Sequence, residues 1–486
     1  MDNKNQLKNR AICGAIWKFA ERICAQLVSL VVSVVLARIL VPEDYSVVSI
    51  VGIFFSFCNI LISGGFNTAL IQKKDADALD YSTVLCITLA VSTVMYGVMF
   101  FCAPYIARLY DKRLLIPVIR VMALTFFINA VKSVLAAYTS SHLQFKKFFL
   151  STIGGTAISA VVGIVMAMEG FGPWALVAQQ MTNSVIDTVI LFITTHFRLS
   201  LRVSWQRLKS LFSYGWKIFV ASIISVVYDE CCPLIVGIKY SGADLAYYNK
   251  GKNFPSLINS SITSTISSVL FPVIARVQDD GDAVLGVTRR YIKTASYVIF
   301  PVMIGFLAVA ETFVLFLLTD KWIAIVPYIQ IFCLSYMLDI VQVGNLQAIR
   351  AMGRSVVILI LEVLKKSVYF AIIAAFVLLS DSPQLLAVSA VICTLVATGI
   401  NTFPNRKLIG YKYRYQLMDL LPNLLLAAAM GAVVLLVGKL PLPSGLLMLL
   451  QIVVGGGVYV LLSAITRNES FLYVLNLVKQ KACKRK

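Results

Sequence analysis

Charged residues are scarce in this sequence. Asp, Glu, Lys and Arg make up 14% of the 486 residues, whereas soluble domains carry about 25%. Hydrophobic residues make up 59%, and the mean hydropathy is +0.85. This composition excludes an ordinary soluble domain and predicts a membrane protein.

Long polar segments and enzyme motifs are also missing. The longest connections between apolar runs, 196–209 and 276–290, are too short to fold as independent soluble domains. The sequence contains no Walker A motif, Rossmann glycine pattern, HExxH motif or nucleophile elbow. We therefore expect neither an ATPase nor a hydrolase module, and we predict that the protein is not an enzyme.

Metal-binding patterns are absent from the sequence as well. The ten cysteines lie almost wholly within apolar runs, and none has the spacing of a zinc or haem site. Asp279, Asp280 and Asp282 lack the spacing and the closing Glu of an EF-hand loop. The sequence therefore predicts no metal site and no cofactor.

Long apolar runs dominate what is present. About fourteen of them are long enough to cross a bilayer as a helix of about 20 residues. They cover 12–38, 45–71, 81–107, 114–139, 148–168, 173–195, 211–238, 245–273, 291–318, 324–349, 355–379, 385–405, 420–438 and 444–466. The sequence therefore predicts an all-α, polytopic membrane protein of about 14 transmembrane helices.

Basic residues set the predicted orientation. An even number of spans places both termini on one side, and the connections on that side are rich in Lys and Arg, as at Lys146, Lys147, Arg289 and Arg290. Because Lys and Arg are enriched in cytoplasmic connections, we expect both termini to be cytoplasmic. The net charge of +20 then reflects topology, with weak attraction to anionic lipids at most, and indicates no nucleic-acid partner.

The first two spans recur later in the chain. Trp17-Lys18 recurs as Trp216-Lys217, about 200 residues on. At nearly the same offset, five polar positions recur as polar: Ser49, Ser56, Asn59, Ser63 and Asn67 match Asn249, Ser256, Asn259, Thr263 and Ser267. We therefore predict two pseudo-symmetric six-helix lobes, over 1–197 and 198–410, with two extra C-terminal helices and a basic amphipathic tail over 411–486.

Cations and small polar groups share one face of these recurring spans. Lys18, Glu21 and Arg22 interrupt the first apolar run, which predicts an uncleaved span whose charges face protein or water. We predict a cationic, aqueous cleft between the lobes that receives an anionic ligand such as a phosphate, with amides and hydroxyls for sugar groups. The candidate substrate-binding residues are Lys18, Arg22, Ser56, Asn59, Lys217, Lys250, Lys252, Ser256 and Asn259.

A purely structural role is the alternative for several of these cations. Glu21 has the i, i+3 spacing that lets it pair with Lys18. Lys250 and Lys252 lie close enough to the outer end of their span to extend toward that interface. Both interpretations stay open at the level of sequence.

Acidic residues in or near the spans are candidates for ion coupling, because each could bind Na⁺ or a proton during transport. They are Glu21, Asp187, Asp229, Asp339 and Glu362. Pairing with a cation on a neighbouring span is the alternative, and it would remove a carboxylate from ion coupling. Glu362 lies three and four residues before Lys365 and Lys366, which favours a local ion pair.

Three motifs resemble those of a known family. They are residues 36–45 (LARILVPEDY), 64–72 (GGFNTALIQ) and 271–276 (FPVIAR). With the span count and the duplicated halves, they make the chain similar to the polysaccharide exporters of the MOP flippase superfamily, in the Wzx-type branch that includes colanic acid exporters. Ser46 stands where that family usually has Gly.

The resemblance implies a V-shaped pair of lobes in the bacterial plasma (inner) membrane. It implies a flippase that moves a polyprenyl-pyrophosphate-linked oligosaccharide to the outer leaflet by alternating access, in the synthesis of O-antigen, lipopolysaccharide or exopolysaccharide. The partners it implies are the lipid-linked oligosaccharide, membrane lipids, a polysaccharide polymerase and glycosyltransferases.

Two other functions are alternatives. A cation-coupled multidrug or small-molecule exporter of the same superfamily should have an acidic or aromatic cleft, whereas the predicted cleft is basic. The other is a membrane scaffold or glycan polymerase. A polymerase should carry a large external loop, whereas the outer connections here are short.

Overall fold

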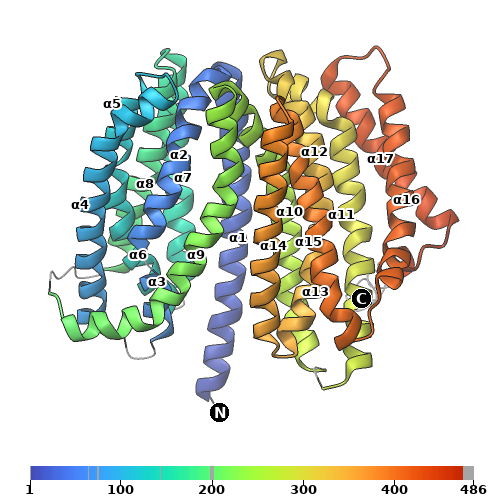
Figure 1. The fold of residues 1–486 in the computed structure, drawn as a ribbon, viewed down its shortest axis with the longest axis horizontal. Coiled ribbons are helices and arrows are strands. Elements are labelled where there is room, and N and C mark those ends of the chain that lie inside the picture. The colour runs from blue at the N-terminus through green and yellow to red at the C-terminus, as the bar shows by residue number, and fades with distance from the viewer. Residues whose placement is uncertain are drawn as a thin grey trace. The chain divides into compact units, whose positions relative to one another are not determined.

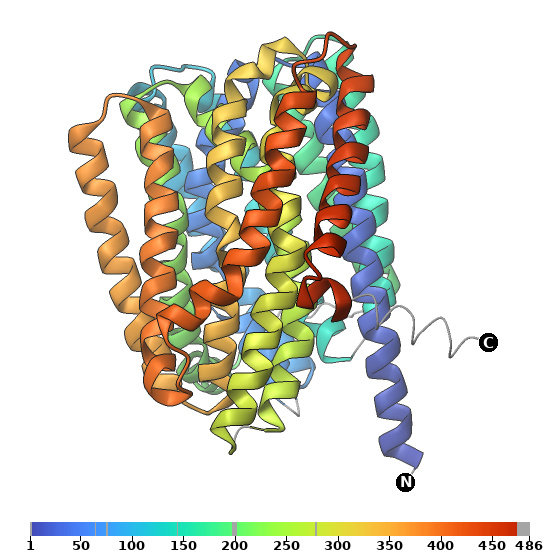
Figure 2. The same cartoon turned by 90° about the vertical axis from the view of Figure 1, so that its right-hand side faces the viewer.

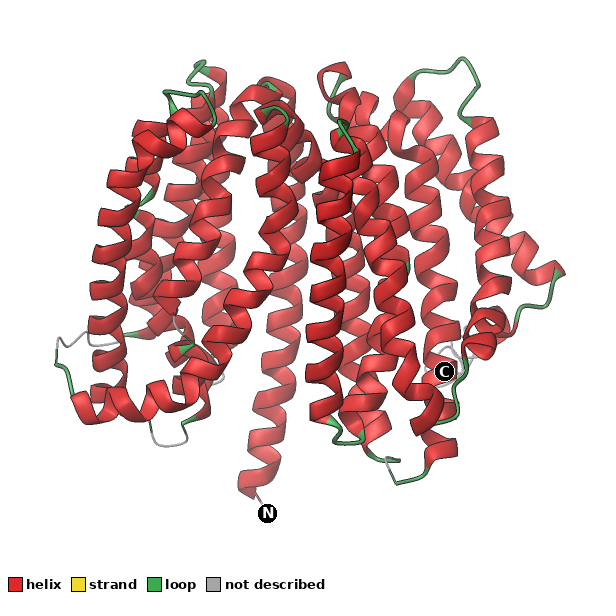
Figure 3. Ribbon diagram, viewed as in Figure 1, coloured by secondary structure: helices red, strands yellow, loops and turns green. Residues whose placement is uncertain are grey.

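Helices make up all the regular secondary structure that the computed structural model describes, which covers residues 2–63, 65–73, 76–142, 144–196, 202–277 and 279–473 (Figure 3). The all-α prediction is confirmed within these ranges. Most of the predicted basic tail, 474–486, and the side chain of Lys18 lie outside the described part of the chain. The helices form two compact units, Met1–Ala246 and Tyr247–Lys486, which we call the first and the second unit.

The first unit contains the spans that the sequence predicts up to 238 (Figure 1). Its helices are α1 (Asp2–Ile39), α2 (Pro42–Ser63), α3 (Phe66–Gln72), α4 (Ala78–Leu109), α5 (Leu115–Met122), α6 (Thr125–Ser141), α7 (Phe145–Met168), α8 (Pro173–Thr195) and α9 (Trp205–Lys239). Two predicted spans are each built from two helices in series, α2 with α3 and α5 with α6.

The second unit contains the later spans. Its helices are α10 (Gly242–Ala275), which begins in the last residues of the first unit, α11 (Gly281–Leu317), the 3₁₀ helix η1 (Asp320–Ile325), α12 (Val326–Met337), α13 (Asp339–Ala351), α14 (Ser355–Leu379), α15 (Pro383–Leu408), α16 (Tyr413–Val437) and α17 (Ser444–Ile465). The predicted lobe boundary at 197 follows the sequence duplication, whereas the compact units divide at 246.

Twelve helical segments in the described chain are long and apolar enough to cross a membrane. The two further predicted spans form α10 and α14, which have 34 and 25 residues. Even the shorter of these is about 37 Å long, more than the hydrocarbon core of a bilayer. They differ from the twelve in polarity, because α10 is rich in Ser and Asn and α14 contains Glu362, Lys365 and Lys366. The structure is therefore consistent with fourteen spans.

The break between α2 and α3 depends on Gly65. Its φ of +74° is a left-handed conformation that side-chain-bearing residues rarely adopt. A Cβ atom at this position would also collide with the carbonyl oxygen of Gly215 on α9. Because neither glycine has a side chain, α9 can approach this break closely, and α9 packs against α2, α3 and α4.

Small residues also bring α7 and α8 together. A Cβ atom at Gly155 would lie 3.0 Å from both the Asn183 Oδ1 atom and the Asp187 Cβ atom, and one at Gly163 would lie 2.9 Å from the Gln179 Cβ atom. Such close approach of backbones is the usual way in which membrane helices gain packing contacts. It places the polar residues of α8 beside α7.

The second unit is organised around α11, which packs against α12, α13, α16 and α17. Figures 1 and 2 show the orange-red and red helices α16 and α17 beside the yellow α11. A buried amide cluster joins α13, α15 and α16, with Asn405 Nδ2 donating to Asn345 Oδ1 at 2.7 Å and Gln416 Nε2 donating to the same oxygen at 3.2 Å. These hydrogen bonds attach α16 to the repeated part of the fold.

Candidate functional site

A cavity in the first unit contains one of the predicted substrate-binding cations. It has a volume of about 550 Å³ and is lined by Lys217, Ser222 and Ser225 on α9 and by Ile60 on α2, with further α9 residues. Lys217 is exposed to this space. The Ser222 hydroxyl donates to the Ile218 carbonyl at 2.8 Å, so its oxygen remains available as an acceptor. The cavity therefore offers one ammonium and two hydroxyls along a single helix face.

On α1, the predicted residues point in different directions. Trp17 packs edge-on against Phe149 at 5.1 Å between ring centroids. Glu21 is buried and accepts a hydrogen bond from the Thr152 hydroxyl at 3.2 Å, whereas Arg22 is exposed. Glu21 thus faces α7, and Arg22 lies away from it. The predicted pairing of Glu21 with Lys18 falls on a side chain outside the described residues.

On α2, Asn59 contacts the fourth predicted span. The Nδ2 atom of Asn129 on α6 donates to the Oδ1 atom of Asn59 at 3.2 Å. Ser56, one turn earlier, donates its hydroxyl proton to the Gly52 carbonyl at 2.9 Å. Both residues are half-buried. They lie on the helix whose Ile60 borders the Lys217 cavity.

The equivalent contact recurs in the second unit. The Nδ2 atom of Asn259 on α10 donates to the Oδ2 atom of Asp339 on α13 at 2.7 Å, and the Oδ1 atom of Asn259 accepts from the Thr263 hydroxyl at 3.0 Å. Asn129 and Asp339 are 210 residues apart, close to the offset of about 200 residues that relates Asn59 to Asn259. The duplication has therefore kept a side-chain contact as well as a polar pattern.

The remaining predicted residues of α10 lie toward its start. Lys250 is buried, and its Nζ atom lies 5.5 Å from the centroid of the Trp322 ring in η1. Tyr247 packs edge-on against the same tryptophan. Lys252 and Ser256 are half-buried. Lys250 thus lies beside an aromatic ring of its own unit.

Asp187, a predicted ion-coupling residue, has a cationic partner. Its Oδ2 atom lies 2.6 Å from the Nζ atom of Lys132 on α6, and the Asp187 side chain is 7% exposed. Sequence reasoning missed Lys132 because the two residues are far apart in the chain. At the position about 210 residues after Lys132, Gln342 accepts a hydrogen bond from Asn401 at 3.3 Å.

Two further ion-coupling candidates lie on α9 and α14. Asp229 is exposed on α9. Glu362 on α14 lies 2.7 Å from the Nζ atom of Lys365, which is the local ion pair that the spacing favours. Among the described residues, no group of three or more His, Cys, Asp or Glu side chains is arranged to hold a metal ion.

Sequence reasoning also missed a charged cluster at the start of α4. Asp80 is fully buried and pairs with Lys73 at 2.7 Å and with Arg207 at 3.0 Å, and Arg207 also pairs with Asp77 at 2.9 Å. The Asp80 backbone N–H, followed by the charge of Arg207, lowers the pKa of Asp77, and the hydrogen bond to Asp80 raises the pKa of Arg207. The one sequence feature that indicated this cluster was the short distance along the chain between Lys73 and Asp80, which allows the two to pair.

Ser82 and Thr83, next to this cluster, hold the residues just before α9. The Ser82 hydroxyl donates to the Arg202 carbonyl at 2.8 Å and accepts from the Arg202 N–H at 2.8 Å. The Thr83 hydroxyl accepts from the Ser204 N–H at 3.1 Å. The start of α9 is therefore attached to α4 within the first unit.

Known proteins share both the sequence pattern and this arrangement of helices. The profile of a family described as "Polysaccharide biosynthesis protein" matches residues 35–327. The chain is 24% identical, over 98% of its length and 99% of the relative, to an "Uncharacterized membrane protein in cps region" of Klebsiella pneumoniae. It is also 24% identical, over 70% of its length and 69% of the relative, to lipopolysaccharide biosynthesis protein WzxC of Escherichia coli (strain K12).

A solved structure shares the fold. The lipid II flippase MurJ, in an inward closed conformation, matches with a TM-score of 0.75 at 13% identity, covering 94% of this chain and 98% of that one. The predicted fold class is therefore confirmed. A third relative, the succinoglycan biosynthesis transport protein ExoT of Rhizobium meliloti (strain 1021), is 23% identical over 62% of this chain and 61% of its own length. Because the family profile matches more than half of the chain, this protein belongs to the polysaccharide biosynthesis protein family.

Proposed function

We propose that this protein is a flippase that moves a polyprenyl-pyrophosphate-linked oligosaccharide from the cytoplasmic to the outer leaflet of the bacterial inner membrane. Its similarity to WzxC, a lipopolysaccharide biosynthesis protein, and to MurJ, a lipid II flippase, supports this class of substrate. In this proposal both termini are cytoplasmic, and the lobes over 1–197 and 198–410 alternate access. A glycosyltransferase must build the repeat unit before transport and a polymerase must join it afterwards, so both are proposed partners.

The Lys217 cavity is the observation that carries the proposal. Its volume of about 550 Å³ is in the range of small-molecule sites, which is about 300–1,000 Å³. The Lys217 ammonium has three donors for phosphate oxygens, and the hydroxyls of Ser222 and Ser225 suit a sugar. The cation and the hydroxyls lie on one helix face. They could therefore bind a headgroup in which the pyrophosphate is attached directly to the first sugar.

The charge of this cavity disfavours the multidrug alternative. Cationic drugs bind best to acidic or aromatic surfaces. The described lining of the Lys217 cavity contains no acidic and no aromatic side chain. A cation would be repelled by Lys217, whereas an anionic headgroup would be attracted.

For coupling, Asp339 is our candidate among the three predicted carboxylates of α8, α13 and α14. Asp187 is paired with Lys132 and Glu362 with Lys365. The Asp339 carboxylate, in contrast, accepts a hydrogen bond from the neutral amide of Asn259. A half-buried carboxylate with a neutral partner can bind a proton or Na⁺ without first breaking an ion pair.

The proposal is tested by replacing Lys217 with Gln in cells that depend on this protein for surface polysaccharide. Loss of a charge-assisted hydrogen bond, worth about 1.5–3 kcal/mol, should reduce export about 10-fold or more. Lys217→Arg should keep most of the export, because it keeps the charge. Polysaccharide on the cell surface and protein in the membrane are measured together.

Lys209→Gln is the matched control, because Lys209 is an exposed lysine on the same helix that does not line the cavity. It should leave export unchanged. Normal export by Lys217→Gln at normal protein levels would contradict the proposed headgroup site. Altered export by both variants to the same extent would also contradict it, since the effect would then follow net charge alone.

A further inference from the structure

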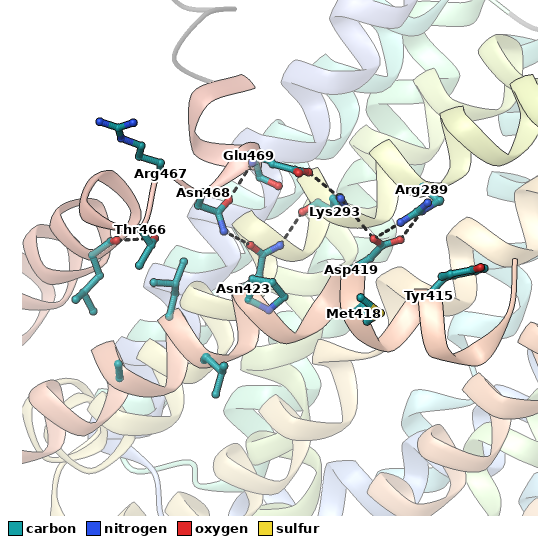
Figure 4. Close-up of a pocket in the computed structure, with 16 residues that line it drawn as sticks. Arg289, Lys293, Tyr415, Met418, Asp419, Asn423, Thr466, Arg467, Asn468 and Glu469 are labelled. Atoms are coloured by element: carbon teal, nitrogen blue, oxygen red, sulfur yellow. Dashed lines mark hydrogen bonds and ion pairs between the residues drawn. The ribbon is translucent and has the colours of Figure 1, made fainter.

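A second, larger cavity lies in the second unit, apart from the repeated spans that carry the proposed substrate face. It has a volume of about 590 Å³ and is bordered by α11, α16 and the segment that follows α17. Figure 4 shows Arg289, Lys293 and Asp419 on its charged side. A neighbouring cavity of about 480 Å³ shares Arg289 and Lys293 and adds Arg290.

The cavity has a preformed polar frame. Asn423 Nδ2 donates to the Lys293 carbonyl at 2.9 Å, and Asn468 Nδ2 donates to the Asn423 Oδ1 atom at 3.0 Å (Figure 4). Asn423 Nδ2 also donates to the Ser296 hydroxyl at 2.8 Å. These bonds tie the segment after α17 to α11 through α16. The backbone of α11 that carries Lys293 is thus attached to both neighbouring segments.

Cations outnumber carboxylates around the two cavities. Arg289, Arg290, Lys293 and Arg467 face Asp419 and Glu469. Asp419 is buried and already satisfied, since Arg289 donates to it twice, at 2.8 and 2.7 Å, and Tyr411 donates at 2.8 Å. The other carboxylate, Glu469, is 81% exposed and pairs with Lys293 at 2.7 Å. Because exposed ion pairs are weak, an anion could replace Glu469 on Lys293.

An apolar wall adjoins these charges. Leu425, Leu426, Ala429 and Leu462 line the larger cavity, and Leu425 is 59% exposed at the protein surface. The membrane-length part of α17 ends at Ile465, so the charged side lies at the end of the spans and the wall continues along them. A charged end followed by an apolar wall is complementary to a phospholipid, whose charged headgroup is followed by an acyl chain.

From this geometry we infer a binding site for an anionic phospholipid of the cytoplasmic leaflet. The phosphate contacts Arg290 and Lys293, and one acyl chain lies along Leu425 and Leu462. The predicted cytoplasmic orientation of this end places the site where anionic lipids are enriched, and basic pockets between membrane helices suit their headgroups. The helices α16 and α17 have no counterpart in the internal repeat, so the site is separate from the proposed headgroup route.

Lipid binding to the purified full-length protein tests this inference. The protein is placed in nanodiscs of phosphatidylcholine, and labelled phosphatidylglycerol is added and detected by energy transfer. Removing two cations in Arg290→Gln/Lys293→Gln should weaken phosphatidylglycerol binding about 10- to 30-fold, at about a factor of five per basic residue. Arg276→Gln/Arg354→Gln removes two exposed cations outside the cavity and should leave binding unchanged.

A gain-of-binding variant guards against misfolding as the cause. Glu469→Gln removes the carboxylate that competes for Lys293, so it should bind phosphatidylglycerol several-fold more tightly. Arg289→Gln is avoided because Arg289 donates two hydrogen bonds to the buried Asp419, whereas Lys293 lies 3.4 Å from that carboxylate. Labelled phosphatidylcholine, which has no net charge, should bind equally to the wild type and to every variant.

Three results would overturn the inference. Equal binding of phosphatidylglycerol by the double variant and the wild type would show that Arg290 and Lys293 do not bind the lipid. Displacement of the lipid by an equal concentration of glycerol phosphate would show that the apolar wall contributes nothing. Preference for polyprenyl phosphate over phosphatidylglycerol would assign the cavity to the transported lipid. Because export is not the readout, failure here leaves the proposed function untouched.

Discussion

The two units join their second and fourth predicted spans by equivalent contacts but with different charges. In the first unit the contact is between the two neutral amides of Asn59 and Asn129, at 3.2 Å. In the second unit an amide meets a carboxylate, Asn259 with Asp339, at 2.7 Å. Both halves have a hydrogen bond at this position. Asn59 accepts it in the first unit, whereas the equivalent Asn259 donates it in the second.

In a second pair of contacts, the charged groups lie in the first unit and the neutral groups in the second. The buried Asp187 forms an ion pair with the partly exposed Lys132 in the first unit, whereas Gln342 and Asn401 form a neutral amide pair in the second. The first unit thus neutralises its buried carboxylate with a cation. The second unit leaves Asp339 beside an amide. The difference teaches that equivalent packing positions can carry different charges in the two halves, and if a carboxylate couples transport to an ion, we expect that coupling to be asymmetric.

The largest expected effect comes from removing the cation of the first unit. Lys132→Met leaves Asp187 buried without its partner, which costs about 3–5 kcal/mol for fully buried pairs. We expect about 3 kcal/mol, because the Lys132 side chain is 35% exposed. The free energy of unfolding in mixed detergent micelles measures this.

The control for this prediction copies the second unit into the first. Lys132→Gln/Asp187→Asn creates an amide pair like that of Gln342 and Asn401, and its stability should return to within about 1 kcal/mol of the wild type. A double variant as unstable as Lys132→Met would mean that the ion pair itself, and not an uncompensated charge, stabilises the first unit.

The broken second span provides the next comparison. In the first unit this span divides into α2 and α3 at Gly65, whereas α10 is continuous over Gly242–Ala275. Gly65→Ala should cost about 2 kcal/mol or more, because Ala disfavours a positive φ and its Cβ atom would collide with Gly215. The matched control is Gly52→Ala on α2, where a Cβ atom meets nothing within 4 Å. Equal stability of the two variants would contradict the proposed close approach of α9.

The amide contacts themselves should differ in strength. Asn259→Ala removes a hydrogen bond to a carboxylate, which is worth about 1.5–3 kcal/mol, whereas Asn59→Ala removes one between amides, worth about 1 kcal/mol. The unfolding free energies of both variants are compared with the wild type. A larger loss for Asn59→Ala would indicate that Asp339 is protonated or otherwise satisfied when Asn259 is absent.

The smallest effect is expected at the helix caps. Asp77 caps α4 and pairs with Arg207, whereas Asp280 caps α11 through the backbone N–H groups of Asp282 and Ala283. The folded-state pKa of Asp77 is lowered, so its contribution is present above the unfolded pKa of about 3.9 and is lost as the pH falls through the lower folded pKa. Asp77→Asn should therefore reduce the acid sensitivity of the melting temperature between about pH 5 and 3.

Arg207→Gln should act in the same direction as Asp77→Asn, because it removes one of the causes of the lowered pKa. Melting temperatures measured over this pH range compare both variants with the wild type. An acid sensitivity that is unchanged in both would show that the cluster at the start of α4 contributes nothing to pH-dependent stability.

Much of the fold was predictable because a bilayer restricts what a chain can do. Its thickness fixes the length of an apolar run, and the backbone must form its hydrogen bonds within each helix. The repeat of Asn59 as Asn259 also identified equivalent positions in the two halves. The division into α2 and α3 at Gly65 was harder to predict, since glycines are common in membrane helices that do not break.

The partners of the polar residues could not be predicted. Periodicity shows which residues share one face of a helix, but not which neighbouring helix that face meets. Lys132, Asn129 and Arg207 each have a partner that is more than 50 residues away in the chain. The cavity between α11 and α16 depends on the same kind of long-range contact.

The sequence by itself determined a polytopic helical membrane protein, its duplication and its excess of basic residues, because each is a property of composition or of regular spacing. Only the tertiary structure decided that Asp187 is neutralised by a cation and that Asp339 lies beside an amide. The physical reason is that close contacts, such as that of Gly155 with Asn183 and Asp187, fix the rotation of one helix against the next. A rotation of one residue would exchange the partners of every polar side chain on that face.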